Sequence, residues 1–138
     1  MARVHSRAID ALNISRAANR AAGRAFKRLL MGHKINAKKC AVFLDGGLYI
    51  NSKKASVEEF RALTVVKGDE KIVAVKIASI IAKVTRDREM KKLSKKFQGY
   101  SFEIHKGYGT ERHIAALKEL GPSPAHRLTF LKNLKLKI

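Results

Sequence analysis

Two aspartates follow short apolar runs and are the residues best suited to do chemistry. Asp45 comes directly after the run 41–44 (AVFL), and Asp69 comes shortly after the run 63–66 (LTVV). Two converging carboxylates repel each other and need a cation between them; Mg²⁺ or Mn²⁺ fits, because hard ions prefer carboxylate oxygens and bridge to substrate phosphate. Capping of a glycine turn by Asp45 and of a helix by Asp69 is the more common use of such residues, so spacing alone leaves both interpretations open.

A second candidate is the segment 104–110 (IHKGYGT), which combines a cation, two glycines and an aromatic ring. Lys106 can meet a phosphate, and Tyr108 offers a ring for stacking on a sugar or base. His105 could act as a proton shuttle, although a histidine that is hydrogen-bonded within the fold is the more common case. The segment 121–127 (GPSPAHR) is typical of a rigid turn that carries an arginine.

The composition indicates a polyanionic partner. The chain has 138 residues, 46% of them hydrophobic, and its Lys and Arg outnumber its Asp and Glu by 30 to 11, a net charge of +19. Such an excess repels itself and is tolerated where a polyanion compensates it, so nucleic acid is the leading partner and an anionic membrane surface the next. The apolar runs are far shorter than the about 20 residues of a membrane span. Because the lone Cys40 also favours a reducing compartment, we expect a cytoplasmic protein.

The segment 15–30 predicts a helix that Gly32 would end. Its predicted apolar face comprises Ala18, Ala22, Ala25 and Leu29. Its other side carries an arginine at every fourth position, namely Arg16, Arg20, Arg24 and Arg28. This row, here called the arginine ridge, costs helix stability by repulsion unless an anion lies against it. A solvated face and a phosphate-binding face are both open at this point.

The remaining patterns predict an α/β fold. The runs 41–44 and 63–66 are typical of buried strands that end in turns. This places the two aspartates at the carboxyl ends of two strands, the region where ligands collect in α/β sheets. A long helix is predicted over 70–97, because its length outweighs the strand preference of its Ile and Val. Thr110 is predicted to cap a helix over 111–120 that Gly121 ends.

Four motifs stand in the order and spacing of the ribonuclease HII family, which the chain resembles over nearly its whole length: VVKGDEK at 65–71, ASIIAKVTRDR at 78–88, HKGYGT at 105–110 and GPSPAHR at 121–127. The resemblance implies an RNase H-like fold, a mixed sheet flanked by helices, in a single domain over 1–138. The family's first strands, with an Asp-Glu pair and a Gly-Arg-Gly loop, have no counterpart in these residues. We therefore expect an N-terminally truncated form of the fold with marginal stability.

The resemblance also implies an endonuclease that cuts the RNA strand of RNA–DNA hybrids, or cuts 5′ to a ribonucleotide embedded in duplex DNA. It makes Asp45 and Asp69 ligands of Mn²⁺ or Mg²⁺ in a two-metal hydrolysis, and it places Tyr108 on the deoxyribose that follows the ribonucleotide. Asp87 is an alternative or supplementary ligand, although a pair with a neighbouring arginine explains it as well. The candidates for phosphate contacts are Lys71, Lys83 and Lys106.

Two other functions remain open at this point. The charge of +19 permits a protein that binds hybrid duplexes without cutting them. A basic structural component of a ribonucleoprotein particle fits the charge and the size but not the motifs. An acid pair at strand ends favours the enzyme over the structural protein. We also expect the protein to be a monomer, to act in DNA replication and repair, and to have no membrane partner.

Overall fold

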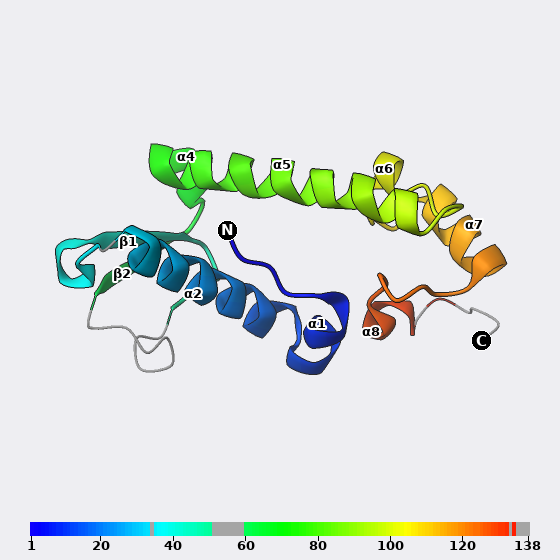
Figure 1. Ribbon diagram of the computed structural model, residues 1–138, viewed down its shortest axis with the longest axis horizontal. Helices are drawn as coiled ribbons and strands as arrows, with labels where there is room; N and C mark the ends of the chain where they lie inside the picture. The colour runs from blue at the N-terminus through cyan, green and yellow to red at the C-terminus, as the bar shows by residue number, and fades with distance from the viewer. Residues whose placement is uncertain (34, 51–59, 133, 135–138) are drawn as a thin grey trace. The chain divides into compact units, whose positions relative to one another are not determined.

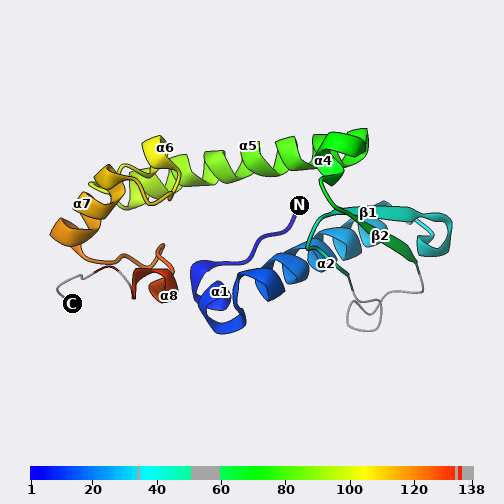
Figure 2. The same cartoon turned by 180° about the vertical axis from the view of Figure 1, so that it is seen from behind.

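The computed structural model describes residues 1–33, 35–50, 60–132 and 134. The chain divides into two compact units, Met1–Ile80 and Ile81–Ile138, and each is described by itself. Figures 1 and 2 show their helices and strands from opposite sides. The single domain expected over 1–138 stays a prediction.

The first unit begins with α1 (Ser6–Leu12) and α2 (Ile14–His33). They are separated by Asn13, which has a positive φ of 68° and whose side-chain oxygen accepts a hydrogen bond from the backbone of Arg16 at 3.0 Å. This bond satisfies one of the unpaired amides at the start of α2. The helix predicted over 15–30 is confirmed, but it runs through Gly32 instead of ending there.

The buried face of α2 differs from the predicted one. Its buried residues are Ala17, Phe26 and Leu30, whereas Leu29 is 49% exposed. The bulky Phe26 and Leu30 pack with Ala37 of the short 3-10 helix η1 (Ala37–Lys39) into a small core, so their size outweighs the predicted face of three alanines and one leucine. All four arginines of the ridge are exposed.

Strands β1 (Ala41–Asp45) and β2 (Arg61–Val65) form a parallel two-stranded sheet in which Asp45 pairs with Val65. Both predicted strands are confirmed, although β2 covers 61–65 instead of 63–66, but the prediction that they are buried is wrong. Leu44 is the one buried residue in them, whereas Phe43 and Leu63 are 41% and 56% exposed. Burial depends on what packs against a strand, which its own sequence does not specify.

The helix predicted over 70–97 is divided into α4 (Gly68–Lys71) and α5 (Val73–Lys96). The break is at Ile72, whose φ of −127° and ψ of 113° are those of a strand. This β-branched residue thus keeps its extended preference between two helices. Several large apolar residues of α5 are exposed: Val73, Ile77, Ile80, Ile81 and Val84. Among the described helices, none is long and apolar enough to cross a membrane.

The second unit adds α6 (Phe102–His105), α7 (Glu111–Leu120) and α8 (Leu128–Leu131) to the later part of α5. Thr110 caps α7 as predicted, its hydroxyl accepting a bond from the backbone of His113 at 3.4 Å. Gly121 ends the same helix with a positive φ of 72°. The core of this unit consists of Tyr100, Phe102, Ala116 and Leu117. The chain is thus a mixed α/β protein, as the sequence predicted, and its described strands form a parallel pair where the resemblance implied a mixed sheet.

Candidate active site

Asp45 is the last residue of β1, and its carboxylate reaches the start of α4. One oxygen, Oδ1, accepts hydrogen bonds from the backbone amides of Gly46 and Gly68, each at 2.9 Å. Gly68 is buried, and a Cβ there would lie 3.3 Å from the Val75 Cγ1 atom and 3.4 Å from Asp45 Oδ1. A side chain at this position would therefore be tight against Val75 and Asp45, whereas glycine fits without displacing either. The role of Asp45 in a glycine turn is confirmed.

Asp69 lies in the first turn of α4 and is exposed. The capping position of that helix is Lys67, so the interpretation of Asp69 as a helix cap is wrong. The parallel pairing puts the carboxyl ends of β1 and β2 at the same edge of the sheet. Because Gly68 is bonded to Asp45 and is followed directly by Asp69, both aspartates lie at this edge.

Three histidines of the second unit form a buried cluster. His105, His113 and His126 are 6%, 6% and 8% exposed. The rings of His105 and His113 are stacked with centroids 4.1 Å apart, and the Nε2 atoms of His113 and His126 are 3.0 Å apart. His105 Nε2 lies 2.6 Å from the carbonyl oxygen of Tyr100, so His105 is hydrogen-bonded within the fold, the more common of its two predicted roles.

The hydrogen bonds of the cluster assign the protons of its rings. The Ser123 backbone amide donates to Nδ1 of His126 at 2.9 Å, so a neutral His126 carries its proton on Nε2 and donates it to His113. His113 Nδ1 then donates to the carbonyl oxygen of Tyr108 at 2.8 Å. This series, here called the histidine relay, ties the turn at 123–126 to the backbone of Tyr108.

Burial keeps the relay neutral. The pKa of His113 and of His126 is lowered from the ordinary value, chiefly because burial disfavours the charged form of each ring. For His126 the neighbouring His113 lowers the pKa further. If either ring were protonated, both of its nitrogens would be donors, and one of them would face another N–H group instead of an acceptor. The relay therefore acts as fixed structure at neutral pH.

The side chain of Tyr108 is 63% exposed while its backbone is held. The Arg86 guanidinium lies over its ring, 4.6 Å from the ring centroid, and also donates to the carbonyl oxygen of Lys106 at 2.6 Å. A cation over the face of an aromatic ring stabilises the ring's position. An oriented and exposed ring of this kind is suited to stacking on a sugar or base.

The model of the ribonuclease HII family matches residues 2–133. The chain belongs to the ribonuclease HII family. Proteins named Ribonuclease HII are 39% identical to it over 134 residues in Caldicellulosiruptor bescii, 45% over 127 in Fusobacterium nucleatum and 40% over 140 in Coxiella burnetii. These matches cover 97%, 91% and 100% of this chain.

The same matches cover 59%, 56% and 63% of the three relatives, so the chain spans less than two thirds of their length. Membership of the ribonuclease HII family accounts for the mixed α/β architecture and its parallel pair of strands. Both features agree with the RNase H-like fold expected from the motifs.

The other residues expected in a ribonuclease HII site are distributed over both units. Lys71, in the first unit, and Lys83, in the second, are exposed. Lys106 is half-buried, and its ammonium group donates to the carbonyl oxygen of Glu103. Asp87 lies 3.7 Å from the guanidinium of Arg86, so it has the neighbouring arginine expected as its partner.

The sequence did not single out Arg86, His113 or Ser123 as residues that support the site. A signal was present for two of them, since Arg86 lies within the TRDR stretch and Ser123 within GPSPAHR. Their function is apparent only from contacts with Tyr108 and His126, which lie 22 and 3 residues further along the chain. Hydrophobic periodicity along the sequence does not reveal the contact between Arg86 and Tyr108, which are 22 residues apart.

Proposed function

We propose that the chain contains the catalytic part of an endoribonuclease that cuts the RNA strand of RNA–DNA hybrids, or cuts 5′ to a ribonucleotide embedded in duplex DNA. The observation that carries this proposal is the position of Asp45 and Asp69 at one edge of a parallel sheet, in a chain of the ribonuclease HII family. Ligands collect beyond the carboxyl ends of such strands.

The donor set at this edge fits Mg²⁺ or Mn²⁺. Both ions prefer hard oxygen ligands, and Mg²⁺ is commonly held by one or two carboxylates together with water and substrate phosphate. Among the described residues, no group of three or more His, Cys, Asp or Glu is arranged to hold a metal. In the two-metal hydrolysis that we propose, Asp45 and Asp69 would hold the ions, whose chemistry would be activation of a water and neutralisation of charge on the leaving 3′ oxygen.

The other residues bind and orient the nucleic acid. Tyr108 packs on the deoxyribose that follows the ribonucleotide, with its backbone held by His113 and its ring by Arg86. Lys71, Lys83 and Lys106 contact phosphates and supply the charge-assisted hydrogen bonds that such contacts provide. The ribose 2′-hydroxyl marks the cutting position, because it is what distinguishes RNA from DNA.

A second candidate function is binding of hybrid duplexes without cleavage. It is favoured by the net charge of +19, while the described residues contain no group of three or more His, Cys, Asp or Glu arranged to hold a metal. Phosphate contacts by Lys and Arg need no metal, so binding would survive where hydrolysis does not.

Cleavage of a DNA duplex that contains one ribonucleotide distinguishes the two functions. The purified chain is incubated with this duplex in Mn²⁺ or Mg²⁺, beside the Asp69→Asn variant and a metal-free control. The proposal predicts metal-dependent cutting that the variant loses while it still binds the duplex. Equal cutting by the variant would reject Asp69 as a metal ligand, and binding without cutting by the folded chain would favour the second function.

A further inference from the structure

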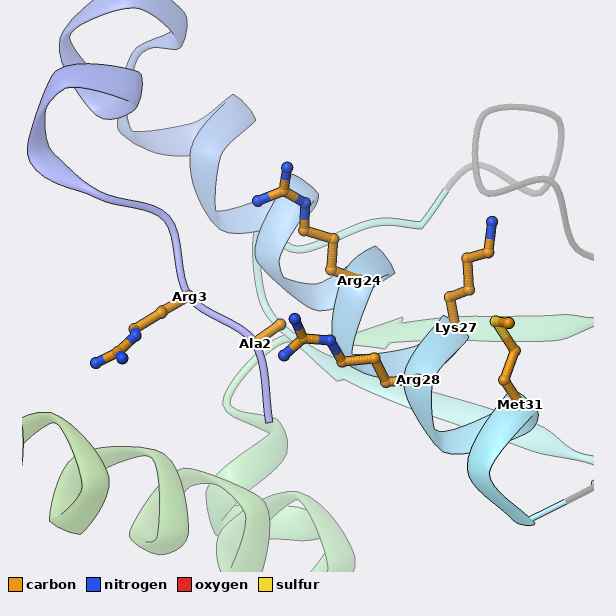
Figure 3. Close-up of a pocket in the computed structure, with 6 residues that line it drawn as sticks. All are labelled: Ala2, Arg3, Arg24, Lys27, Arg28 and Met31. Carbon is orange, nitrogen blue, oxygen red and sulfur yellow. The ribbon is translucent and has the colours of Figure 1, made fainter.

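A basic pocket lies on the exposed side of α2. It has a volume of about 450 Å³ and is formed by the N-terminal segment and the second half of the helix (Figure 3). The residues that line it are Ala2, Arg3, Arg24, Lys27, Arg28 and Met31. Four of these described residues are cationic and none is acidic, so the pocket presents a concentrated positive charge.

The cations of α2 in this pocket share one face of the helix. Arg24, Lys27 and Arg28 stand at positions i, i+3 and i+4, which are neighbours on a helix surface. The buried Phe26 and Leu30 lie on the other face and fix the rotation of α2, so the three cations are directed outwards. Figure 3 shows Arg24 and Lys27 projecting to the same side, while the Arg28 guanidinium lies beside Ala2.

The positive charge of Arg24, Lys27 and Arg28 is not compensated by a carboxylate within the described part of the chain. Arg24 and Lys27 have no carboxylate partner there. The Arg28 Nη1 atom donates to the carbonyl oxygen of Met1 at 2.8 Å, a single bond that orients the guanidinium and leaves its other donors for a ligand. Adjacent like charges destabilise a helix, and an anion in the pocket would remove that repulsion.

We propose that this pocket binds a phosphate group of a nucleic-acid backbone, outside the sheet edge that carries the aspartates. Arg24 and Arg28 also belong to the arginine ridge, which continues along α2 to Arg20 and Arg16. The ridge extends over about 18 Å of helix, the rise of about five base pairs of a duplex. A row of cations of this length matches a polymer of phosphates better than it matches a single lipid headgroup or a free phosphate ion. The proposal rests on the proposed function for nucleic acid as the source of the phosphate.

Binding of a short all-DNA duplex without ribonucleotide or divalent metal tests this site by fluorescence anisotropy. The pocket variant is Arg24→Gln/Lys27→Gln. The control is Lys91→Gln/Lys95→Gln, which removes the same charge from exposed positions of α5. Duplex affinity is measured between about 50 and 200 mM salt. At the lower salt concentration the pocket variant should bind the duplex roughly tenfold more weakly than the wild-type chain. The slope of its log affinity against log salt concentration should be smaller in magnitude by about two.

The control should lose distinctly less affinity and salt dependence than the pocket variant. Equal losses in both variants, or unchanged binding by the pocket variant, would overturn the proposal. If circular dichroism shows that the double variant does not fold, Lys27→Gln alone should make the slope shallower by about one; an unchanged slope would again overturn the proposal.

Two further probes identify the source of the phosphate. Inorganic phosphate and vesicles of phosphatidylserine with phosphatidylcholine are titrated against the wild-type chain and the pocket variant. Loss of vesicle or free-phosphate binding with unchanged duplex binding would assign the pocket to another ligand and overturn the proposal. Failure of the proposed cleavage would leave the duplex result unaffected, since this assay contains neither divalent metal nor ribonucleotide.

Discussion

The sheet edge of the first unit and the histidine relay of the second unit use polar residues in opposite ways. At the sheet edge, Asp69 is exposed and Asp45 is half-buried, with one carboxylate oxygen held by two backbone amides. In the relay, His113 and His126 are buried and bonded to each other and to the backbone. The edge is open to a ligand, whereas the relay is complete without one.

The sheet edge is therefore suited to chemistry, whereas the histidine relay is suited to positioning another residue. Carboxylates that are to hold a cation and meet a phosphate have to keep an oxygen accessible, and an exposed oxygen contributes little to stability. Buried rings that hold the backbone of Tyr108 have to be fully hydrogen-bonded, because an unpaired buried polar group is costly. Substitutions in the two regions should therefore act on different measured quantities.

The largest effect on stability is expected in the core that surrounds the relay. Phe102 is 3% exposed and packs against the rings of His105, His113 and His126. Phe102→Ala should lower the free energy of unfolding by about 3–5 kcal/mol, measured by urea denaturation. In the same helix, Ile104 is 55% exposed, and Ile104→Ala should change the stability by less than about 0.5 kcal/mol. Equal effects would show that this core is not packed as described.

The pH dependence of stability should come from the relay. Because burial lowers the pKa of His113 and His126, the unfolded chain takes up protons near pH 6.5 more readily than the folded one. Stability should be complete above that pH and fall as the pH decreases, by up to about 1.4 kcal/mol per pH unit for each histidine. His126→Gln should make the decrease shallower; urea denaturation at several pH values that gives the same decrease for both proteins would contradict this account.

At the sheet edge, the two aspartates should differ in their effect on stability. Asp45→Ala leaves the amides of Gly46 and Gly68 without their acceptor and should cost about 1–3 kcal/mol. Asp69→Ala removes an exposed side chain and should change the unfolding free energy by less than about 0.5 kcal/mol. The comparison is made by urea denaturation at neutral pH, and a cost for Asp69→Ala as large as that for Asp45→Ala would refute it.

A small effect on stability is expected at Tyr108. Its exposed ring gains about 0.5–1 kcal/mol from the cation above it, which is all that Tyr108→Ala should cost. The same substitution should weaken selection of the RNA–DNA junction more than it weakens duplex binding, as mapped from the cleavage products. Tyr108→Phe keeps the ring and should keep the selection, and Tyr49→Ala, at another exposed tyrosine, is the control. An unchanged cutting pattern in Tyr108→Ala would exclude this role.

The sequence predicts local features of this molecule better than packed ones. The helix at 15–30, the strands ahead of Asp45 and Asp69, and the cap at Thr110 depend on short-range patterns and are confirmed. The exposure of both strands was not predicted, because it depends on which elements pack against them. The relay was missed because His113 and His126 meet across 13 residues, and no periodic pattern connects them. The family motifs supplied the candidate roles of the aspartates, which spacing alone left open.

Binding of Mn²⁺ tests most directly whether the open sheet edge is a metal site. Electron paramagnetic resonance measures Mn²⁺ bound to the wild-type chain and to Asp45→Asn, Asp69→Asn and Asp87→Asn, each with an all-DNA duplex present to supply phosphates. We predict affinities weaker by roughly tenfold or more for the first two variants, since even substitutions beside a metal's direct ligands cost about that much, and an unchanged affinity for Asp87→Asn. Unchanged binding by Asp45→Asn and Asp69→Asn, or an equal loss in Asp87→Asn, would contradict the account.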